Sequence, residues 1–337
     1  MNRVQREAVE DGLLAVRDLE VRYRLPGSAH RFLQAVRGVS LDIRRGEILA
    51  VVGESGSGKT SLARAILGLL EPSGGTLHID GIDLLGPGRR PARRRIQAVF
   101  QDPLAALSPR RTVLQSVREP LDHLRLGAPS LRRADALRAL ETVGLEPQLG
   151  ERYPHELSGG QRQRAALARA IAPRPELIVA DEPLSSLDLS LQYRMVRLIR
   201  DLGERTGIAF LVISHDLSVV RRLADRVAVM YLGQLVETGP AEALFDRPAH
   251  PYTQTLLDAV PVADPDHPPP RVPHAAKAGD ALALQVLRPA VDDIVRMIRR
   301  LVEVGSPKIA LVGGLAEPMT KWLPQEARTR LVAPEAD

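Results

Sequence analysis

The stretch ILAVVGESGSGKTSLARAILGLL, residues 48–70, decides the fold of this 337-residue chain. An apolar, β-branched run leads into a glycine-rich loop, residues 53–60, and a helical pattern follows the loop. This order of strand, loop and helix is the setting that a phosphate-binding loop requires. Because short apolar runs alternate with helical patterns elsewhere in the chain, the sequence predicts an α/β fold with a partly parallel sheet.

The residue types in the loop suit a bound nucleotide. Glycines let the backbone turn its N–H groups inward around an anion, and the helix N-terminus adds partial positive charge. We expect Lys59 to reach the β- and γ-phosphates and the Thr60 hydroxyl to coordinate Mg²⁺. A glycine-rich turn with an incidental lysine is the alternative, which the number of fixed positions opposes. The predicted contacts to the nucleotide here are Gly53, Glu54, Ser55, Gly56, Ser57, Gly58, Lys59, Thr60 and Ser61.

A second motif, LIVADE at residues 177–182, is an apolar strand pattern that ends in two carboxylates. Asp181 would lie at the carboxyl end of the strand and hold the hydration shell of the metal beside Thr60. Glu182 would point in another direction and meet the attacking water as a base or an orienting group. Acidic turns after strands are common, so the acidic pair indicates a functional site only because the chain also contains a phosphate loop.

The rest of the chain divides by pattern. Residues 1–12 are polar and are expected to be flexible, and residues 13–260 carry the α/β pattern. Within it, residues 103–156 are rich in Leu, Ala and Arg without strand patterns, which predicts a helical insert. The clearest predicted strands are 48–52, 177–180 and 209–213.

A different kind of sequence follows residue 260. Residues 261–274 contain three consecutive prolines, which predicts an extended linker. Residues 275–337 read as a separate piece with a strand at 309–312 before a Gly-Gly pair. The apolar residues of that piece recur at spacings of three and four, which predicts one amphipathic helix over Leu287, Val291, Ile294, Ile298 and Leu301.

Composition excludes several classes of function. The 46 Lys and Arg exceed the 41 Asp and Glu by only five, and the excess is dispersed, so no nucleic-acid partner is expected. The absence of cysteine excludes disulfides, thiolate zinc sites and iron–sulfur ligation by this chain. No apolar run is long enough to span a bilayer and no signal peptide is apparent, so any membrane role is expected to come through partners.

The segment LSGGQRQR, residues 157–164, resembles the signature motif of ABC ATPases and lies between the phosphate loop and the acidic pair. A serine-capped helix with a Gly-Gly turn is common, but the full motif in this order is specific. Its backbone N–H groups and hydroxyl form a second anion cradle at a helix N-terminus. The resemblance implies that a partner subunit's nucleotide contacts this cradle, which comprises Ser158, Gly159, Gly160 and Gln161.

Other landmarks of this family follow in order over residues 12–262. Gln101 resembles the glutamine that contacts Mg²⁺ and water, and His215 resembles the histidine that contacts the γ-phosphate. Asp188, in SSLD, resembles the family's D-loop aspartate near the nucleotide. Tyr23 lies where the family stacks an aromatic ring on adenine, although a strand tyrosine is more often plain packing. The resemblance implies Mg²⁺ ligands Thr60, Gln101 and Asp181 and catalytic residues Glu182, His215, Gln101 and Lys59.

The resemblance also implies an architecture and an assembly. The fold would be a P-loop NTPase core with an N-terminal antiparallel β subdomain and a helical insert, plus a small C-terminal α/β appendage. Two ATPase subunits would pair head to tail, so each nucleotide would lie between the phosphate loop of one and the signature of the other. The chain would hydrolyse ATP while attached peripherally to the cytoplasmic face of the inner membrane.

Two stretches, residues 101–113 and 246–261, resemble the oligopeptide/dipeptide and nickel importer branch of the family. The HPYT within the second is otherwise a proline turn that caps a helix. Members of this branch usually use two different ATPases, so we expect a heterodimer with a second ATPase subunit. Two transmembrane permeases and, indirectly, a substrate-binding protein complete the implied assembly.

Residues 275–337 resemble instead the C-terminal end of N-acetylglucosamine kinases and BadF/BadG-type ATPases. The kinase's own phosphate loops and catalytic aspartate are missing, so no sugar phosphorylation is expected. A docking element, a regulatory remnant and a fusion trace remain open for this segment.

For the whole chain, oligopeptide or dipeptide import is the leading hypothesis. The alternatives are import of nickel or another small solute, a soluble ABC ATPase, a sugar kinase and a binding module without enzymatic activity.

Overall fold

The fold is seen in a computed structural model of the chain. Contacts divide the chain into two units, Met1–Thr253 and Gln254–Asp337. The structure describes residues 12–24, 32–87, 89–185, 187–258, 309–310, 325 and 331–332. In the second unit, β11 (Ile309–Ala310) pairs in parallel with β12 (Leu331–Val332). The predicted proline linker, the amphipathic helix over 287–301 and most of the kinase-like segment lie outside the described residues.

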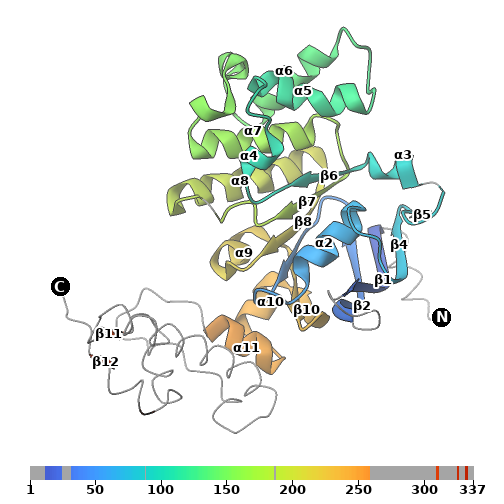
Figure 1. Ribbon diagram of the computed structural model, residues 1–337, viewed down its shortest axis with the longest axis vertical. Helices are drawn as coiled ribbons and strands as arrows, with labels where there is room; N and C mark the ends of the chain where they lie inside the picture. Colours follow the sequence, from blue (N-terminus) through green and yellow to red (C-terminus); the bar gives the residue numbers. More distant parts are fainter. Residues whose placement is uncertain are drawn as a thin grey trace. The chain divides into compact units, whose positions relative to one another are not determined.

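A six-stranded sheet forms the centre of the first unit, in the order β10-β9-β3-β8-β7-β6 (Figure 1). Its neighbours pair in parallel except for the antiparallel pair of β9 and β10. All residues of β3 and β8 are buried, which explains their continuous apolar runs. The strands are β3 (Ile48–Val52), β6 (Ile96–Val99), β7 (Leu177–Asp181), β8 (Ala209–Ser214), β9 (Arg226–Tyr231) and β10 (Gln234–Pro240). The three strands predicted most clearly are therefore confirmed.

A second, antiparallel sheet has the order β2-β1-β4-β5. It consists of β1 (Gly12–Arg24), β2 (Phe32–Arg44), β4 (Gly74–Ile79) and β5 (Ile82–Asp83), and confirms the expected N-terminal β subdomain. Its buried side chains share one hydrophobic core with those of β3 and of α2 (Lys59–Leu67). The helix α2 contacts strands of both sheets, so the helix that follows the phosphate loop is packed from two sides.

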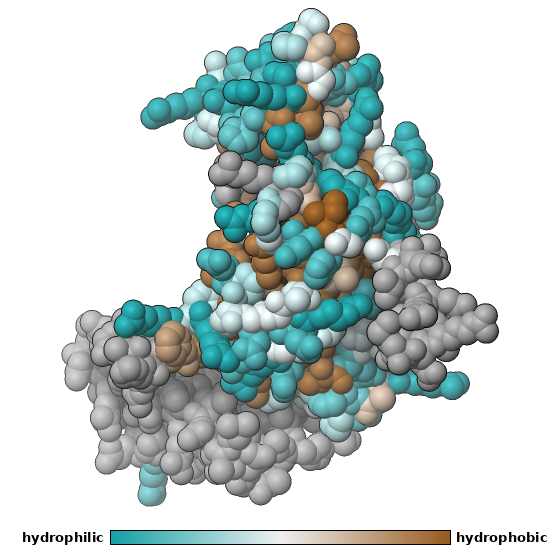
Figure 2. Space-filling view, turned by 90° about the vertical axis from the view of Figure 1, so that its right-hand side faces the viewer, coloured by the Kyte–Doolittle hydropathy of each residue, from teal (hydrophilic) through white to brown (hydrophobic). Residues whose placement is uncertain are grey.

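A group of helices interrupts the sheet between β6 and β7 and lies at the top of Figure 1. Leucines and valines of these helices pack into the same core as the neighbouring faces of β6 to β8. In the face shown in Figure 2, this helical part is mostly hydrophilic, and hydrophobic side chains gather lower, at mid-height. The elements are α4 (Pro103–Ala106), α5 (Val113–His123), α6 (Arg132–Thr142), η1 (Pro147–Glu151), η2 (Pro154–Glu156) and the returning α7 (Gly159–Ile171).

The remaining helices flank the sheets. They are α3 (Arg89–Arg93), α8 (Leu189–Thr206), α9 (Leu217–Leu223), α10 (Ala241–Asp246) and α11 (Pro251–Asp258). Among the residues that the structure describes, none of the helices has the length and hydrophobicity needed to cross a membrane.

An ion-pair network joins the two sheets at the end opposite the phosphate loop. Glu176 accepts hydrogen bonds from Arg95 Nε at 2.5 Å and Arg45 Nη1 at 2.6 Å. Both arginines also pair with Asp80 at the end of β4. The hydrogen bond from Arg95 lowers the pKa of Glu176 below its usual value, so this carboxylate stabilises the folded state while it is ionised.

Candidate functional site

The phosphate loop connects β3 to α2 with two glycines that no other residue could replace without strain. Gly53 has φ 150° and Gly58 has φ 107°. A Cβ atom would lie 2.1 Å from the Met230 carbonyl oxygen at Gly53, and 2.2 Å from the Ala35 carbonyl oxygen at Gly58. The backbone therefore needs glycine here for its conformation and also for its close approach to neighbouring strands.

Lys59 is folded back over the loop that precedes it. Its Nζ donates to the carbonyl oxygens of Gly53 and Glu54, both at 2.7 Å, and lies 3.3 Å from Ser57 Oγ. The side chain is only 6% exposed, and burial lowers the pKa of Lys59 despite nearby carboxylates. Lys59 and the loop amides together suit an anionic ligand, and the loop residues Glu54, Ser55 and Gly56 are exposed to solvent.

Thr60 and Asp181 meet at the carboxyl ends of β3 and β7, as predicted. Thr60 Oγ1 lies 3.5 Å from Asp181 Oδ1, and burial raises the pKa of Asp181 while the Thr60 hydrogen bond opposes that shift. Val99, two residues before the exposed Gln101, pairs with Ala180, so Gln101 belongs to the same edge of the sheet.

The oxygen ligands at this edge fit Mg²⁺. A hydroxyl, a carboxylate and an amide are the kind of protein ligands that Mg²⁺ uses when it keeps waters and binds substrate phosphates. No group of three or more His, Cys, Asp or Glu side chains that could hold a metal alone occurs in the described ranges.

Glu182 and His215 form a direct pair. Glu182 Oε1 lies 2.8 Å from Nδ1 of His215. Glu182 has φ 48°, a conformation that is uncommon for residues other than glycine, and its N–H donates to the Ile213 carbonyl at 2.9 Å. Because Asp181 is paired with Ile213 in the sheet, the turn at Glu182 gives the two consecutive carboxylates different partners: Asp181 contacts Thr60 and Glu182 contacts His215. The sequence predicted both side chains for the site, but not their mutual contact.

Tyr23 lies beside the first turn of α2. Its hydroxyl is 3.1 Å from Ser61 Oγ, and its ring packs against the core of the N-terminal sheet. This position adjoins the phosphate loop. Stacking of the Tyr23 ring on adenine stays a prediction.

The signature segment begins α7 with a reciprocal cap. Ser158 Oγ accepts the Gln161 N–H at 3.3 Å, and Gln161 Oε1 accepts the Ser158 N–H at 2.9 Å. A Cβ atom at Gly160 would lie 3.0 Å from Leu191 Cδ2, so this position is crowded. At Gly159, by contrast, apart from its chain neighbours and the backbone of its own helix, no atom of the described residues lies within 4 Å of such a Cβ. The chain itself therefore gives no steric reason for glycine at 159.

Asp188 caps α8. Its Oδ1 accepts the Leu191 N–H and the Ser190 hydroxyl, both at 2.9 Å, and the Leu191 bond is the main cause of its lowered pKa. These contacts account for the aspartate within the chain, and its contact with nucleotide stays a prediction. The neighbouring Ser186 lies outside the described residues.

Two residues that the motifs did not single out also contact the site. Gln163 is 1% exposed and donates from Nε2 to the Pro183 carbonyl at 2.5 Å, directly after Glu182. The sequence feature that could have indicated Gln163 is a glutamine on the buried face of an alanine-rich helix. The Tyr252 hydroxyl accepts the Glu54 N–H of the phosphate loop at 3.0 Å. Tyr252 belongs to the HPYT segment, which indicated a family and a turn but no contact.

Comparison with known proteins agrees with this geometry. Residues 36–185 match the ABC transporter family, and residues 236–280 match the oligopeptide/dipeptide transporter C-terminal region. A putative peptide import ATP-binding protein of Brucella ovis is 48% identical over 260 residues, which is 76% of this chain and 81% of the relative. The chain belongs to the ABC transporter family. The C-terminal match ends inside the segment predicted to resemble a sugar kinase, so that segment begins within sequence typical of the importer branch.

Further similarities extend along most of the ATPase domain. Glutathione import ATP-binding protein GsiA of Salmonella typhimurium is 47% identical over 279 residues, which is 80% of this chain and 45% of GsiA. The chain thus spans about half the length of that relative. The solved ATP-binding cassette MJ0796, a dimer in a post-hydrolysis state with ADP and phosphate, matches 68% of this chain and 98% of its own at 30% identity, with a TM-score of 0.60. CbiO1 of Clostridium perfringens, part of the cbiONQ transporter complex, covers 70% and 92% at 29% identity and a TM-score of 0.62. These neighbours confirm the P-loop ATPase fold of this ABC transporter family member.

Proposed function

We propose that this chain binds and hydrolyses ATP to power import by an ABC transporter, with oligopeptides or dipeptides as cargo. The observation that carries the proposal is the meeting of five side chains at one edge of the sheet. The buried Lys59 lies in the phosphate loop, Thr60 faces Asp181, and Glu182 is paired with His215. The names of the peptide and glutathione import relatives support the cargo class.

The residues of the chain suggest how hydrolysis would proceed. Glu182 would accept a proton from a water whose oxygen attacks the γ-phosphorus, while the bond to the β–γ bridging oxygen breaks and releases ADP and phosphate. His215, 2.8 Å from Glu182, would hold the carboxylate in place. Lys59 and the loop amides would offset the negative charge of the phosphates. Mg²⁺, held by Thr60, Asp181 and Gln101, would neutralise phosphate charge when bound.

One chain supplies only half of each proposed site. The Gly159 position is open, and the backbone N–H groups of the signature segment lie at the N-terminus of α7, where an anion is favoured. We therefore place there the γ-phosphate of a nucleotide bound to a second ATPase subunit. A heterodimer is proposed because importers of this branch usually combine two different ATPases.

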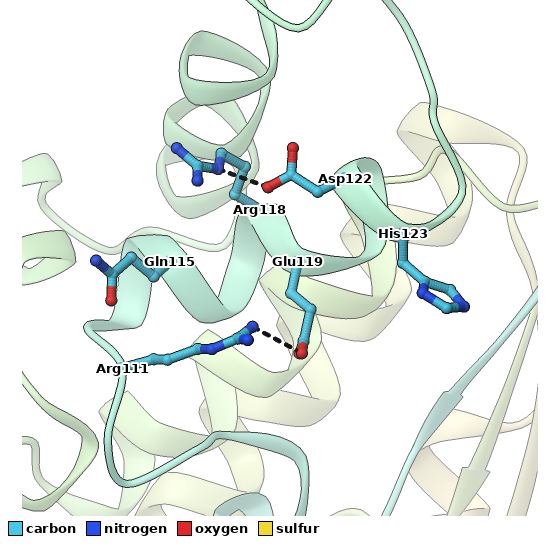
Figure 3. A pocket seen from close by; sticks show the side chains of 6 residues that line it. All are labelled: Arg111, Gln115, Arg118, Glu119, Asp122 and His123. Atoms are coloured by element: carbon cyan, nitrogen blue, oxygen red, sulfur yellow. Dashed lines mark hydrogen bonds and ion pairs between the residues drawn. The ribbon is translucent and has the colours of Figure 1, made fainter.

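A charged hollow on the helical insert is our candidate contact for a permease. It has a volume of about 550 Å³ and lies along α5 (Figure 3). Arg111 pairs with Glu119 and Arg118 with Asp122, each at 2.8 Å, so most charges of the lining already have partners. The lining side chains are Arg111, Gln115, Arg118, Glu119, Asp122 and His123. A short polar segment of a permease on the cytoplasmic face could dock here without leaving charges unpaired, and a substrate-binding protein would act through the permeases.

The variant Glu182→Gln tests the catalytic part. It keeps the shape and a hydrogen-bonding group but removes the base, so ATP should bind as before while kcat falls by about 10²- to 10⁴-fold. Isothermal titration calorimetry and a phosphate-release assay measure the two quantities. Normal turnover by the variant would show that Glu182 does not have this role. Co-purification with hydrophobic permeases tests the membrane assembly, and recovery with soluble proteins alone would favour a soluble ABC ATPase.

A further inference from the structure

The HPYT segment reaches the phosphate loop through one side chain. The Tyr252 hydroxyl oxygen accepts the Glu54 N–H at 3.0 Å across 198 residues of sequence. On the other side of the same residue, Lys59 Nζ donates to the Glu54 carbonyl oxygen at 2.7 Å. Both backbone polar groups of Glu54 are therefore held, one by α11 and one by the lysine that is expected to bind phosphate.

Tyr252 is itself fixed by its surroundings. Its ring packs at a tilt against that of Tyr231, at the end of β9, with 4.2 Å between ring centroids and 35° between the planes. Burial raises the pKa of Tyr252 to about 12, so the hydroxyl is neutral under ordinary conditions. A rigid aromatic side chain held in this way carries its hydroxyl to the loop at little further cost in conformational entropy.

The residues before Tyr252 are anchored as well. The Glu237 carboxylate of β10 accepts the N–H groups of Ala249 at 2.8 Å and His250 at 3.0 Å. His250 Nδ1 in turn accepts the Tyr252 N–H at 3.1 Å, at the start of α11. These contacts explain two of the HPYT residues physically: His250 caps the first turn of α11, and Tyr252 extends from that turn to the phosphate loop.

We infer that Tyr252 is a positioning residue that keeps the phosphate loop in the conformation that receives nucleotide. This inference rests on the proposed ATP site. The loop needs such support because Gly53, Gly56 and Gly58 all have positive φ, and glycines gain much conformational freedom when they are released. A loop that is already ordered loses less entropy on binding, so its affinity for phosphate is higher.

The variant Tyr252→Phe tests the inference, because it keeps the ring and its contact with Tyr231 but removes the hydroxyl. Glu54 is exposed, so water can take over its N–H, and the expected loss is at the low end for a hydrogen bond. We expect Kd for ATP to rise about two- to fivefold. Binding is measured by calorimetry on the full chain in a Glu182→Gln background, which prevents turnover. In the otherwise wild-type chain, KM should rise by a similar factor while kcat is unchanged.

Tyr231→Phe is the matched control, because it removes a neighbouring tyrosine hydroxyl and keeps the same contact between the rings. It should leave Kd unchanged. Hydrogen exchange adds a readout that a purely structural role would not alter. Without nucleotide, the amides of residues 53–59 should exchange faster in Tyr252→Phe than in the parent, and saturating ATP should remove the difference.

The outcomes distinguish the positioning role of Tyr252 from the proposed ATP site. Equal Kd and equal exchange in Tyr252→Phe and its parent would overturn the positioning role and leave the ATPase proposal intact. A lowered Tm together with an unchanged Kd would also overturn it, since the hydroxyl would then support only the fold. If the Glu182→Gln parent itself binds no ATP, the proposed function fails, and the inference fails with it.

Discussion

Gly159→Ala separates the stability of this chain from its proposed partnership. Apart from its chain neighbours and the backbone of its own helix, the added methyl group meets no atom of the described residues within 4 Å, and the residue lies at the first position of α7 without a positive φ. Alanine is the better helix former by up to about 1 kcal/mol in a helix interior, and this terminal position gives at most that gain. The Tm of the variant should therefore equal that of the wild type or exceed it by at most about 2–4 °C.

Activity should change in the opposite direction. The methyl group would occupy the space assigned to a phosphate of the partner's nucleotide and push it away from the amides of the cradle. Loss of one such preorganised contact lowers turnover by on the order of 10²-fold. The phosphate loop of the same chain is untouched, so the affinity of the isolated chain for ATP should stay at the wild-type value.

The assay combines thermal unfolding and ATP calorimetry of the purified chain with steady-state hydrolysis by the chain paired with its second ATPase subunit. Gly58→Ala is the contrasting variant, because its methyl group would lie 2.2 Å from the Ala35 carbonyl oxygen and should reduce stability and ATP binding together. Wild-type hydrolysis by Gly159→Ala would refute the composite site. A marked loss of stability would refute the geometric reasoning, because it would mean that the methyl group is crowded within its own chain.

Two other substitutions test the phosphate loop and the ion-pair network around Glu176. Lys59→Ala removes the buried cation of the phosphate loop and should weaken ATP binding by at least about tenfold in calorimetry. An unchanged affinity would exclude a role of Lys59 in binding phosphate. Glu176→Gln weakens the bonds to Arg45 and Arg95 and should cost about 1 kcal/mol in urea unfolding near pH 7, after allowance for solvent screening. Because the folded pKa of Glu176 lies below the unfolded value of 4.5, its contribution is present above that pH and is lost as pH falls through the folded pKa. The difference between wild type and variant should thus shrink on acidification, and a constant difference would contradict the ionic explanation.

The parts of the fold that local pattern determines were predictable. The strands β3, β7 and β8 are short β-branched runs buried on both faces, and such runs show up directly in sequence. The phosphate loop, the acidic pair and the signature cap are equally local, since each needs particular residue types at fixed spacing. Parallel pairing then brings Thr60 and Asp181 to the same sheet edge, which the sequence also predicted.

The contacts that escaped prediction join residues far apart in the chain. Tyr252 and Glu54, or Arg45 and Glu176, meet only because of how the sheets are packed, and nothing next to either residue in sequence indicates its partner. The positive φ of Glu182 was also invisible, because glutamate has no local preference for it and tertiary contacts must impose it.

The buried hydrogen bond of Gln163 makes the signature helix and the turn after Glu182 mechanically one piece. Its Nε2 lies 2.5 Å from the Pro183 carbonyl oxygen and Gln163 is 1% exposed, so a rotation of α7 would displace the residue that follows Glu182. In a head-to-tail pair, α7 would sense the nucleotide of the neighbour while Glu182 acts on its own. Binding of the neighbour's nucleotide at α7 would then influence the position of Glu182, and so the rate of hydrolysis at this chain's own site.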